Sequence, residues 1–308
     1  YDWGAMNADQ IQKFLNARVP VCTDNDGGPK CLRNYKEDVV GSYAIRGSLH
    51  SYSLNICSEV PAATGRTAAQ IISSVATACR INPRVLLVTL QKEQGLVGSA
   101  DPTTYMYKAA MGYGCPDSAP QICGQDSNSK SRLFWQLYRA AWQLRWYGDP
   151  RGSFTYLKPG KTISMGYHPN ASCKRQTFKL KSQATAKLYY YTPYVPNAAA
   201  LRNLWGTGDS CSAYGNRNFW RQFWTWFGSP VAGGYLLKGS SNLTYLVNQD
   251  SSKRYLISDD AMANDFQPLG PLGTVSDAYL DSFVDAGSLK PLVLSLIHIS
   301  EPTRLLSI

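Results

Sequence analysis

The amino-acid sequence predicts a mainly helical α+β domain followed by a small β-rich module. Over the first 230 residues, several stretches combine an N-capping side chain with apolar residues at helical spacing. Beyond residue 230 cysteine disappears, and short alternating runs bounded by turn residues take over. A chain of 308 residues is long enough for one substantial domain and one small one. We therefore divide it into residues 1–230, residues 231–294 and a tail, residues 295–308.

Helices are predicted where a capping side chain precedes apolar residues at helical spacing. Asn7 and Gln10 have the spacing of a capping box, and Gly148-Asp-Pro150 provides a stop for the long helix before it. The aromatic run from Phe219 to Phe227 is expected to pack in the core, as such stripes usually do. The predicted helices start at or next to Asn7, Thr67, Asn82, Ser131, Ser182, Asn197 and Asn216.

Three stretches of the first domain lack clear helical periodicity. Residues 20–59 are rich in turn residues, and residues 153–177 are typical of strands or irregular structure. Residues 98–130 form a long loop with several tyrosines and glycines. Loops of that length inside a compact domain are usually functional or disordered, and a disulfide within this one would favour order. We therefore expect it to wall one side of a cleft.

After residue 230 the pattern predicts short strands. Apolar runs occupy residues 235–237, 245–247 and 253–257, with a turn at Asp250-Ser-Ser252 between the last two, and Ser258 can cap a short helix. A module of about 60 residues is too small to be an enzyme by itself and is better suited to binding or spacing.

The 8 cysteines lie singly and never as a C-x-x-C pair, which argues against a zinc site. An even number of cysteines, all within the first 211 residues, indicates disulfides in an exported protein. The four cysteines outside two short local loops can pair in several ways. The pairs that we expect are Cys22–Cys31 and Cys115–Cys123, which close these local loops, and Cys57–Cys79.

The formal charge of +10 and the pI near 9.1 favour a polyanionic partner such as nucleic acid, an acidic polysaccharide or a bacterial cell wall. The sequence has no zinc-finger spacing, basic zipper or RNP-like motif, so nucleic acid is not the expected partner. The 20 Tyr and 8 Trp suit the flat faces of sugar rings as well as ordinary core packing. No apolar run reaches the roughly 20 residues of a membrane helix, so no membrane span is expected.

One carboxylate, Glu93, lies on a predicted helix made largely of aliphatic residues. Leu86, Leu90 and Glu93 are spaced at i, i+4 and i+7, so the carboxylate shares a face with two leucines, whereas Gln91 and Lys92 are expected to face water. A carboxyl held against apolar side chains can keep its proton near neutral pH, which a general acid needs. The alternative is a surface acid at a helix end.

The sequence offers little for metal, cofactor or histidine chemistry. Its histidines, His50, His168 and His298, lie far apart and lack neighbours at ligand spacing. No P-loop, dinucleotide fingerprint or HExxH motif is present. We therefore expect no metal and no cofactor, and acid–base chemistry would rest on carboxylates, which suits the cleavage of glycosidic bonds.

The segment Pro83-Arg-Val-Leu-Leu-Val-Thr-Leu-Gln-Lys-Glu-Gln94 resembles the catalytic helix of the lysozyme-like superfamily, in particular goose-type lysozymes and soluble lytic transglycosylases. The resemblance implies a lysozyme-like fold for residues 1–230 and makes Glu93 the general acid that protonates the glycosidic oxygen. Met111-Gly-Tyr-Gly114 stands where that superfamily has a Gly-Leu-Met-Gln substrate segment, although the order of residues differs. Thr192-Pro-Tyr-Val-Pro-Asn197 lies about where a late Tyr-Asn motif is found, which implies a place in the cleft for Tyr194.

Residues 7–230 more closely resemble a group of exported actinobacterial proteins described as hypothetical or haemagglutinin-like, which implies no particular activity. Residues 235–293 are similar to a repeated surface module that follows such domains. Because the chain starts at Tyr1, we expect a mature or truncated form whose export signal lies upstream, and a secreted or cell-surface location. Residues 295–308 resemble translated sequencing-adaptor sequence, so we expect the natural chain to continue differently past about Leu294.

These observations predict a secreted, disulfide-bonded glycosidase that cleaves peptidoglycan, a muramidase or lytic transglycosylase. A hydrolase needs a second carboxylate, for which Asp209 is the first candidate and Asp101 and Asp117 are others, whereas a lytic transglycosylase can work with one. The alternative is a non-catalytic adhesin that binds peptidoglycan or another anionic cell-wall polysaccharide on a lysozyme-like scaffold. The residues expected to line the sugar groove are Tyr105, Tyr107, Met111, Tyr113 and Tyr194.

Overall fold

A computed structural model of the chain describes residues 3–23, 28–42, 56–115, 132–180, 182–227, 235–247, 253–257 and 273–289. Contacts between residues divide the chain into two compact units, Tyr1–Pro230 and Val231–Ile308. Each unit combines helices with small sheets, so the fold belongs to the mixed α+β class. Asp117, Cys123, Ser258 and residues 295–308 lie outside the described residues, and so do the predictions made for them.

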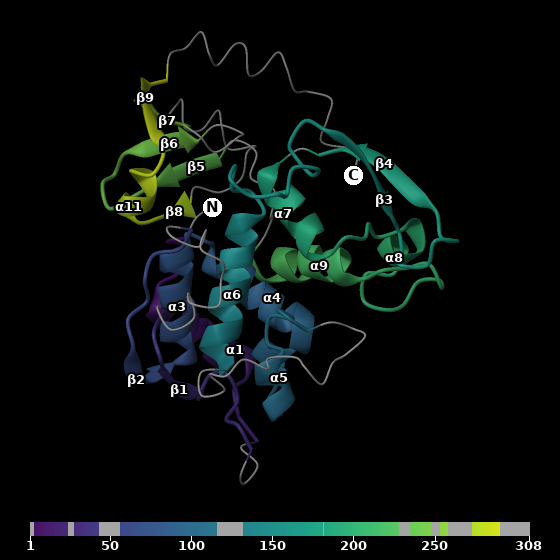
Figure 1. The fold of residues 1–308 in the computed structure, drawn as a ribbon. Coiled ribbons are helices and arrows are strands. Elements are labelled where there is room, and N and C mark those ends of the chain that lie inside the picture. Colours follow the sequence, from purple (N-terminus) through teal and green to yellow (C-terminus); the bar gives the residue numbers. More distant parts are fainter. Residues whose placement is uncertain are drawn as a thin grey trace. The chain divides into compact units, whose positions relative to one another are not determined.

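Helices dominate the described part of the first unit (Figure 1). Two antiparallel strand pairs accompany them: β1 (Lys36–Val39) with β2 (Ala63–Thr67), and β3 (Thr162–Gly166) with β4 (Arg175–Lys179). The helices are α1 (Ala8–Arg18), α3 (Ala68–Cys79), α4 (Pro83–Gln94), the 3-10 helix η2 (Leu96–Gly98), α5 (Thr104–Lys108), α6 (Arg132–Trp146), α7 (Gln183–Tyr191), α8 (Ala198–Arg202) and α9 (Gly215–Phe227).

Local caps start the first helices where the sequence predicts them. The Asn7 side chain accepts a hydrogen bond from the Gln10 backbone N–H at 2.9 Å, and Gln10 Oε1 accepts one from the Asn7 N–H at 2.9 Å. Thr67 and Gln70 form the same reciprocal pair in front of α3. Each box satisfies two N–H groups that have no partner within the helix, because the first turn lacks preceding carbonyls.

The last large helix of the unit starts differently from the prediction. α9 begins at Gly215, so Asn216 lies inside its first turn and is not the N-cap. The Asn216 side chain instead donates hydrogen bonds to the carbonyls of Thr192 (2.7 Å) and Tyr194 (2.9 Å). Asn216 therefore joins the start of α9 to the segment after α7. Its side chain bonds to these two distant carbonyls and not to the N–H groups of its own helix.

The main core forms where α3 packs against both α1 and α6 (Figure 1). Ile72 and Val75 of α3 are buried, as are Phe134 and Tyr138 of α6, in agreement with the predicted inner faces of these helices. The Cys57–Cys79 disulfide, also predicted, joins the last residue of α3 to the segment before β2, and the predicted Cys22–Cys31 disulfide closes its local loop.

The N-terminus of α6 is capped by a side chain from far away in the sequence. Glu37, on β1, is buried, and its carboxylate accepts hydrogen bonds from the backbone N–H groups of Leu133 (3.2 Å) and Phe134 (2.7 Å) and from the Tyr35 hydroxyl (2.7 Å). A carboxylate at a helix N-terminus is stabilised by the free N–H groups and by the helix dipole. Glu37 thus joins the β1–β2 pair to α6.

The aromatic stripe of α9 belongs to the core only in part. Phe219 and Phe223 are buried against Val88 of α4, as predicted. Trp220 and Trp224, however, are 37% and 51% exposed. The prediction that the whole stripe packs in the core is therefore wrong, because α4 covers one face of α9 and leaves the tryptophan face open.

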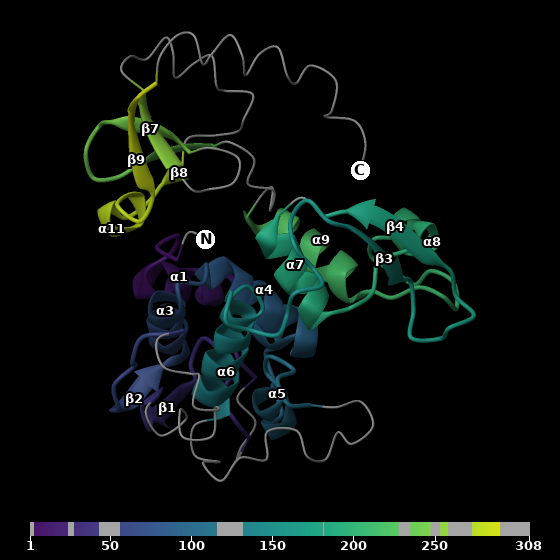
Figure 2. The same cartoon turned by 45° about the horizontal axis from the view of Figure 1, so that its top comes forward.

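The β3–β4 pair and α8 lie side by side in both views (Figures 1 and 2). The Val195 N–H donates a hydrogen bond to the Gly166 carbonyl at the end of β3 (3.0 Å). A disulfide between Cys173 and Cys211, one of the pairings that the sequence leaves open, fastens the β3–β4 connection to the chain before α9. Ile163 and Leu180 belong to a separate small core at this end of the unit.

The second unit contains a five-stranded sheet in the order β8-β5-β6-β7-β9. The outer strands β8 and β9 pair in parallel with β5 and β7, whereas the three middle strands are antiparallel to one another. These middle strands contain the apolar runs predicted as strands. The elements are β5 (Tyr235–Lys238), β6 (Thr244–Val247), β7 (Lys253–Ile257), β8 (Gly273–Thr274), α11 (Asp277–Leu280) and β9 (Val284–Ser288).

Candidate functional site

Glu93 lies one residue before the end of α4, which is bounded by local signals at both ends. The Asn82 side chain accepts a hydrogen bond from the Arg84 N–H (2.9 Å), Pro83 occupies the first turn, and Gly95 ends the helix with a left-handed φ of 65°. Leu86 and Leu90, on the same face as Glu93, are fully buried. The Glu93 side chain is 23% exposed, so the carboxylate lies where the buried face of α4 reaches the surface.

The carboxylate of Glu93 packs directly over Gly112. A Cβ built on Gly112 would lie 3.0 Å from Glu93 Oε2 and 3.1 Å from Glu93 Cδ, and φ of Gly112 is +69°. Both the close approach and the left-handed backbone favour glycine at this position. The loop after α5 is thus shaped to receive the Glu93 side chain, which brings the two sequence-predicted segments together.

Lys92 does not face water as the sequence predicts. Its side chain is only 9% exposed, and its Nζ lies 2.7 Å from Glu93 Oε1. Nζ also donates a hydrogen bond to Thr192 Oγ1 (3.0 Å) and lies 5.4 Å from the centre of the Tyr191 ring. The end of α7 supplies these partners, so packing by a distant segment buries a residue that helical periodicity places outside.

Tyr191 connects α7 to the loop that carries Gly112. Its hydroxyl donates a hydrogen bond to the Met111 carbonyl. Burial first, and the negative charge of Glu93 second, hold the pKa of Tyr191 well above its ordinary value. The hydroxyl therefore stays neutral and acts as a fixed donor beside the carboxylate.

Gln136 of α6 holds the same loop from the other side. Its side-chain oxygen accepts hydrogen bonds from the N–H groups of Met111 (3.1 Å) and Tyr113 (3.2 Å), and its amide donates to the Tyr113 carbonyl (2.9 Å). Gln136 is fully buried, and every one of these contacts goes to backbone groups. Sequence reasoning missed this residue, since a glutamine within a helix gives no signal that a loop docks on it.

Two of the predicted sugar-groove residues are part of the core instead. Tyr107 is buried, its ring stacks on Tyr35 at a centroid distance of 4.1 Å, and its hydroxyl donates to the Lys30 carbonyl (2.7 Å). Met111 is also fully buried. The prediction that these two side chains line the groove is therefore wrong, because α5 places Tyr107, and the turn after α5 places Met111, in the interior of the unit.

The remaining predicted groove residues reach the surface to different extents. Tyr105, on the outer side of α5, is 47% exposed. Tyr113 is half-buried, with its ring edge-on to Trp135 at 5.8 Å. Tyr194 is half-buried and is held through its carbonyl by Asn216.

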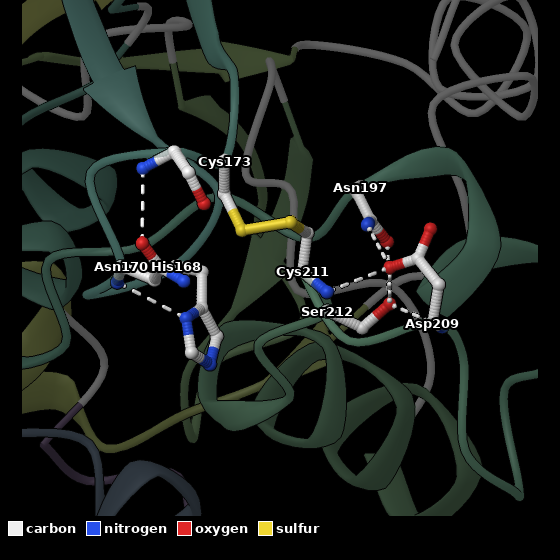
Figure 3. Close-up of a disulfide and its surroundings, with 8 residues drawn as sticks. His168, Asn170, Cys173, Asn197, Asp209, Cys211 and Ser212 are labelled. Carbon is white, nitrogen blue, oxygen red and sulfur yellow. Dashed lines mark hydrogen bonds between the residues drawn. A yellow bond between two sulfur atoms is a disulfide. The ribbon is translucent and has the colours of Figure 1, made fainter.

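Asp209 is held within its own loop (Figure 3). Its Oδ1 accepts hydrogen bonds from Asn197 Nδ2 (2.8 Å), Ser212 Oγ (3.0 Å) and the Cys211 N–H (3.0 Å). The bonds from Asn197 and Ser212 hold the pKa of Asp209 below its ordinary value. These contacts order the turn next to the Cys173–Cys211 disulfide, and none of them involves Glu93.

The same close-up shows His168 in the turn after β3, where its Nδ1 accepts a hydrogen bond from the Asn170 N–H (3.1 Å) (Figure 3). Asp101, another candidate second carboxylate, is exposed. In the part of the chain that the structure describes, no group of three or more His, Cys, Asp and Glu residues could hold a metal ion.

A small cavity lies between α4, α6, α7 and α9, next to Lys92. Its volume is about 10 Å³, room for about one water molecule, so it is not a substrate groove. It is lined by Thr89, Lys92, Leu144, Leu188, Tyr191, Thr192, Asn216 and Phe219.

Comparisons of the chain with protein-family models, with curated proteins and with solved structures find no match. The Cys22–Cys31, Cys57–Cys79 and Cys173–Cys211 disulfides fit an oxidising environment such as the extracellular space. Among the described residues, no helix is both long and apolar enough to cross a membrane.

Proposed function

We propose that residues 1–230 form a secreted, lysozyme-like domain that cleaves the glycan strands of peptidoglycan, with Glu93 as the general acid. The observation that carries the proposal is the position of Glu93: a carboxylate on a buried helix face that reaches the surface against Gly112, with Lys92 and Tyr191 beside it. General acid catalysis needs a carboxyl group that is held in place and still reaches a substrate oxygen. The second unit would act as a surface module.

The Lys92–Glu93 ion pair must open before the carboxyl group of Glu93 can contact a glycosidic oxygen. Lys92 Nζ lies 2.7 Å from Glu93 Oε1 and also donates a hydrogen bond to Thr192 Oγ1 (3.0 Å). Lys92 can therefore leave the carboxylate and still keep one partner. We propose that a bound glycan separates Lys92 from Glu93 and leaves Lys92 on Thr192.

The hydrogen bonds of Asp209 favour a reaction that uses a single carboxylate. Because Asp209 is engaged by Asn197, Ser212 and Cys211, it is a poor candidate for the second carboxylate of a hydrolase. A lytic transglycosylase needs only one, since the muramic 6-hydroxyl attacks in place of water. We therefore place transglycosylation ahead of hydrolysis within the proposed function.

The second candidate function is a non-catalytic adhesin that binds an anionic wall polysaccharide on the same scaffold. The same engagement of Asp209, together with the ion pair of Glu93, favours it, because neither carboxylate is free of a polar partner.

The experiment that separates the two is release of soluble muropeptides from purified actinobacterial cell walls by the full chain. We expect release by the wild type, none by Glu93→Gln, and unchanged release by Glu59→Gln, which alters an exposed acid elsewhere. Mass spectrometry of the products should show anhydro ends for transglycosylation and reducing ends for hydrolysis. Equal wall binding by wild type and Glu93→Gln, with no release by either, would establish the adhesin instead.

A further inference from the structure

Three tryptophans of the first unit are exposed to solvent and are not packed in a core. Trp220 and Trp224 on α9 are 37% and 51% exposed, and their rings stack with centroids 5.8 Å apart and planes inclined by 30°. Trp205, in the turn after α8, is 71% exposed. Large indoles left in water cost free energy, so an exposed group of them commonly marks a binding surface.

Arg221 joins these tryptophans into one surface. Its guanidinium lies 4.2 Å from the centre of the Trp205 ring and donates a hydrogen bond to the Leu204 carbonyl (2.6 Å). Trp224 is three residues after Arg221 and four after Trp220, so its side chain is a neighbour of both on the surface of α9. We call this group, Trp205, Trp220, Arg221 and Trp224, the tryptophan surface.

Among the residues that the structure describes, Arg217 and Arg221 donate hydrogen bonds to no carboxylate. Arg217, buried next to Arg221, donates to the carbonyls of Ala200, Asn203 and Gly206 and to the Asn218 side chain, all neutral oxygens. Arg221 Nε is buried and has no hydrogen-bond partner among the described residues.

The surrounding chain adds to this excess of positive charge. Residues 150–227 hold 11 Lys and Arg but a single acidic residue, Asp209. Several of these basic side chains are exposed on the β3–β4 pair and its connections, namely Lys158, Lys161, Lys174, Arg175 and Lys179. This part of the unit therefore attracts anionic polymers.

We propose that the tryptophan surface binds an acidic glycan, a chain of sugar rings that bear carboxylate or phosphate groups. The indole faces would stack on the apolar faces of successive sugar rings, and the arginines would attract the acidic groups. Single-stranded nucleic acid also combines flat rings with negative charge. The Cys173–Cys211 disulfide in this part of the chain favours a glycan, because it indicates an oxidising compartment, where wall and matrix polysaccharides are the abundant polyanions.

The surface stands apart from the proposed cleavage site. Trp220 and Trp224 lie on the face of α9 that α4 leaves open, whereas Phe219 and Phe223 face Val88 of α4. Binding at the tryptophan surface is thus expected to persist in Glu93→Gln. The proposal of this binding surface does not depend on whether the chain cleaves a glycan.

The test is a titration of the full chain, followed by intrinsic tryptophan fluorescence and by calorimetry, with an oligogalacturonate as the probe. The methyl-esterified oligomer supplies the same rings without charge, inorganic polyphosphate supplies charge without rings, and an oligothymidylate represents nucleic acid. We expect the oligogalacturonate to bind more tightly than all three, and the binding to weaken as salt is raised.

Substitutions should then locate the site. Trp205→Ala and Trp224→Ala should each raise the Kd for the oligogalacturonate about 5-fold to 10-fold, in line with the loss of one aromatic contact. Tyr156→Ala removes a comparably exposed aromatic ring, 58% exposed with Lys161 over it, and should leave the Kd unchanged. Arg221→Lys should keep part of the attraction, whereas Arg221→Gln should lose it.

Three results would overturn the proposal. Tighter binding of the oligothymidylate would make the partner a nucleic acid. An unchanged Kd in both Trp205→Ala and Trp224→Ala would show charge attraction without a defined site. A change in the sedimentation velocity of Trp224→Ala with no change in glycan affinity would make this face a contact between two copies of the chain.

Discussion

Lys92 Nζ lies 2.7 Å from Glu93 Oε1, so two adjacent residues of one helix, normally about 100° apart around its axis, form an ion pair. The pair exists because Thr192 and the Tyr191 ring draw the lysine back along α4. Within this pair the Glu93 side chain is 23% exposed and the Lys92 side chain 9%, so the carboxylate is the member that a substrate can reach more easily.

Replacing Lys92 should speed wall cleavage. In Lys92→Met no ion pair has to open before a glycan contacts the Glu93 carboxyl group. An ion pair that is partly exposed contributes up to about 1 kcal/mol, so we expect the rate of muropeptide release to rise by up to about 5-fold. Lys36→Met, which removes an exposed charge on β1, is the control. Identical rates for wild type and Lys92→Met would show that the ion pair does not obstruct the reaction.

Replacing Gly112 by alanine should damage the site more than it damages the fold. The new Cβ would lie 3.0 Å from Glu93 Oε2 and would push the carboxylate aside, while the left-handed backbone costs about 1 kcal/mol of stability. Gly65→Ala provides a matched control, since Gly65 has φ +60° and open space around its Cβ position. Both variants should lose similar stability in urea unfolding, but only Gly112→Ala should lose cleavage. Equal cleavage by the two variants would argue against Glu93 as the reacting group.

Removing the Glu37 carboxylate should destabilise the first unit. Glu37→Ala leaves the buried N–H groups of Leu133 and Phe134 without their partner, and each unsatisfied donor costs about 1–3 kcal/mol. Glu59→Ala, at an exposed position, should change stability by less than about 0.5 kcal/mol. Urea unfolding followed by circular dichroism measures both. A Glu37→Ala variant as stable as the wild type would mean that water replaces the cap.

Lys187 makes stability depend on pH. Burial first, and the charge of Arg145 second, lower the pKa of Lys187 to about 8, against 10.5 for the free side chain. The unfolded chain therefore binds more protons between these two values, and stability rises as the pH rises from about 8 toward 10.5.

The matching variant is Lys187→Met, which keeps most of the volume without the charge. It should raise the melting temperature at pH 7, where the buried ammonium destabilises the folded state by up to about 3 kcal/mol. Above the pKa of the free lysine the difference from wild type should shrink, because both side chains are then neutral in both states. A gain in stability that is the same at every pH would assign the effect to packing and not to the charge.

Local signals in the sequence determined much of the helical framework. Asn82, Pro83 and Gly95 bound α4, and the Asn7 and Thr67 capping boxes start α1 and α3, because caps and periodicity act between residues only a few positions apart. The middle strands of the second unit and the local Cys22–Cys31 disulfide follow from the same short-range logic. Glu93 could likewise be singled out as a carboxylate on an apolar face.

Only the tertiary structure decided what each of these elements meets. Glu37 caps a helix that starts about a hundred residues later. Asn216 donates hydrogen bonds to two distant carbonyls and does not cap its own helix. Lys92 is buried because α7 covers it, and Trp224 is exposed because α4 covers the other face of α9. The periodicity of one segment tells which residues share a face, but the partner that covers that face comes from elsewhere in the chain. The physical reason is that burial and ion pairing are properties of two packed surfaces, and no single stretch of sequence contains both.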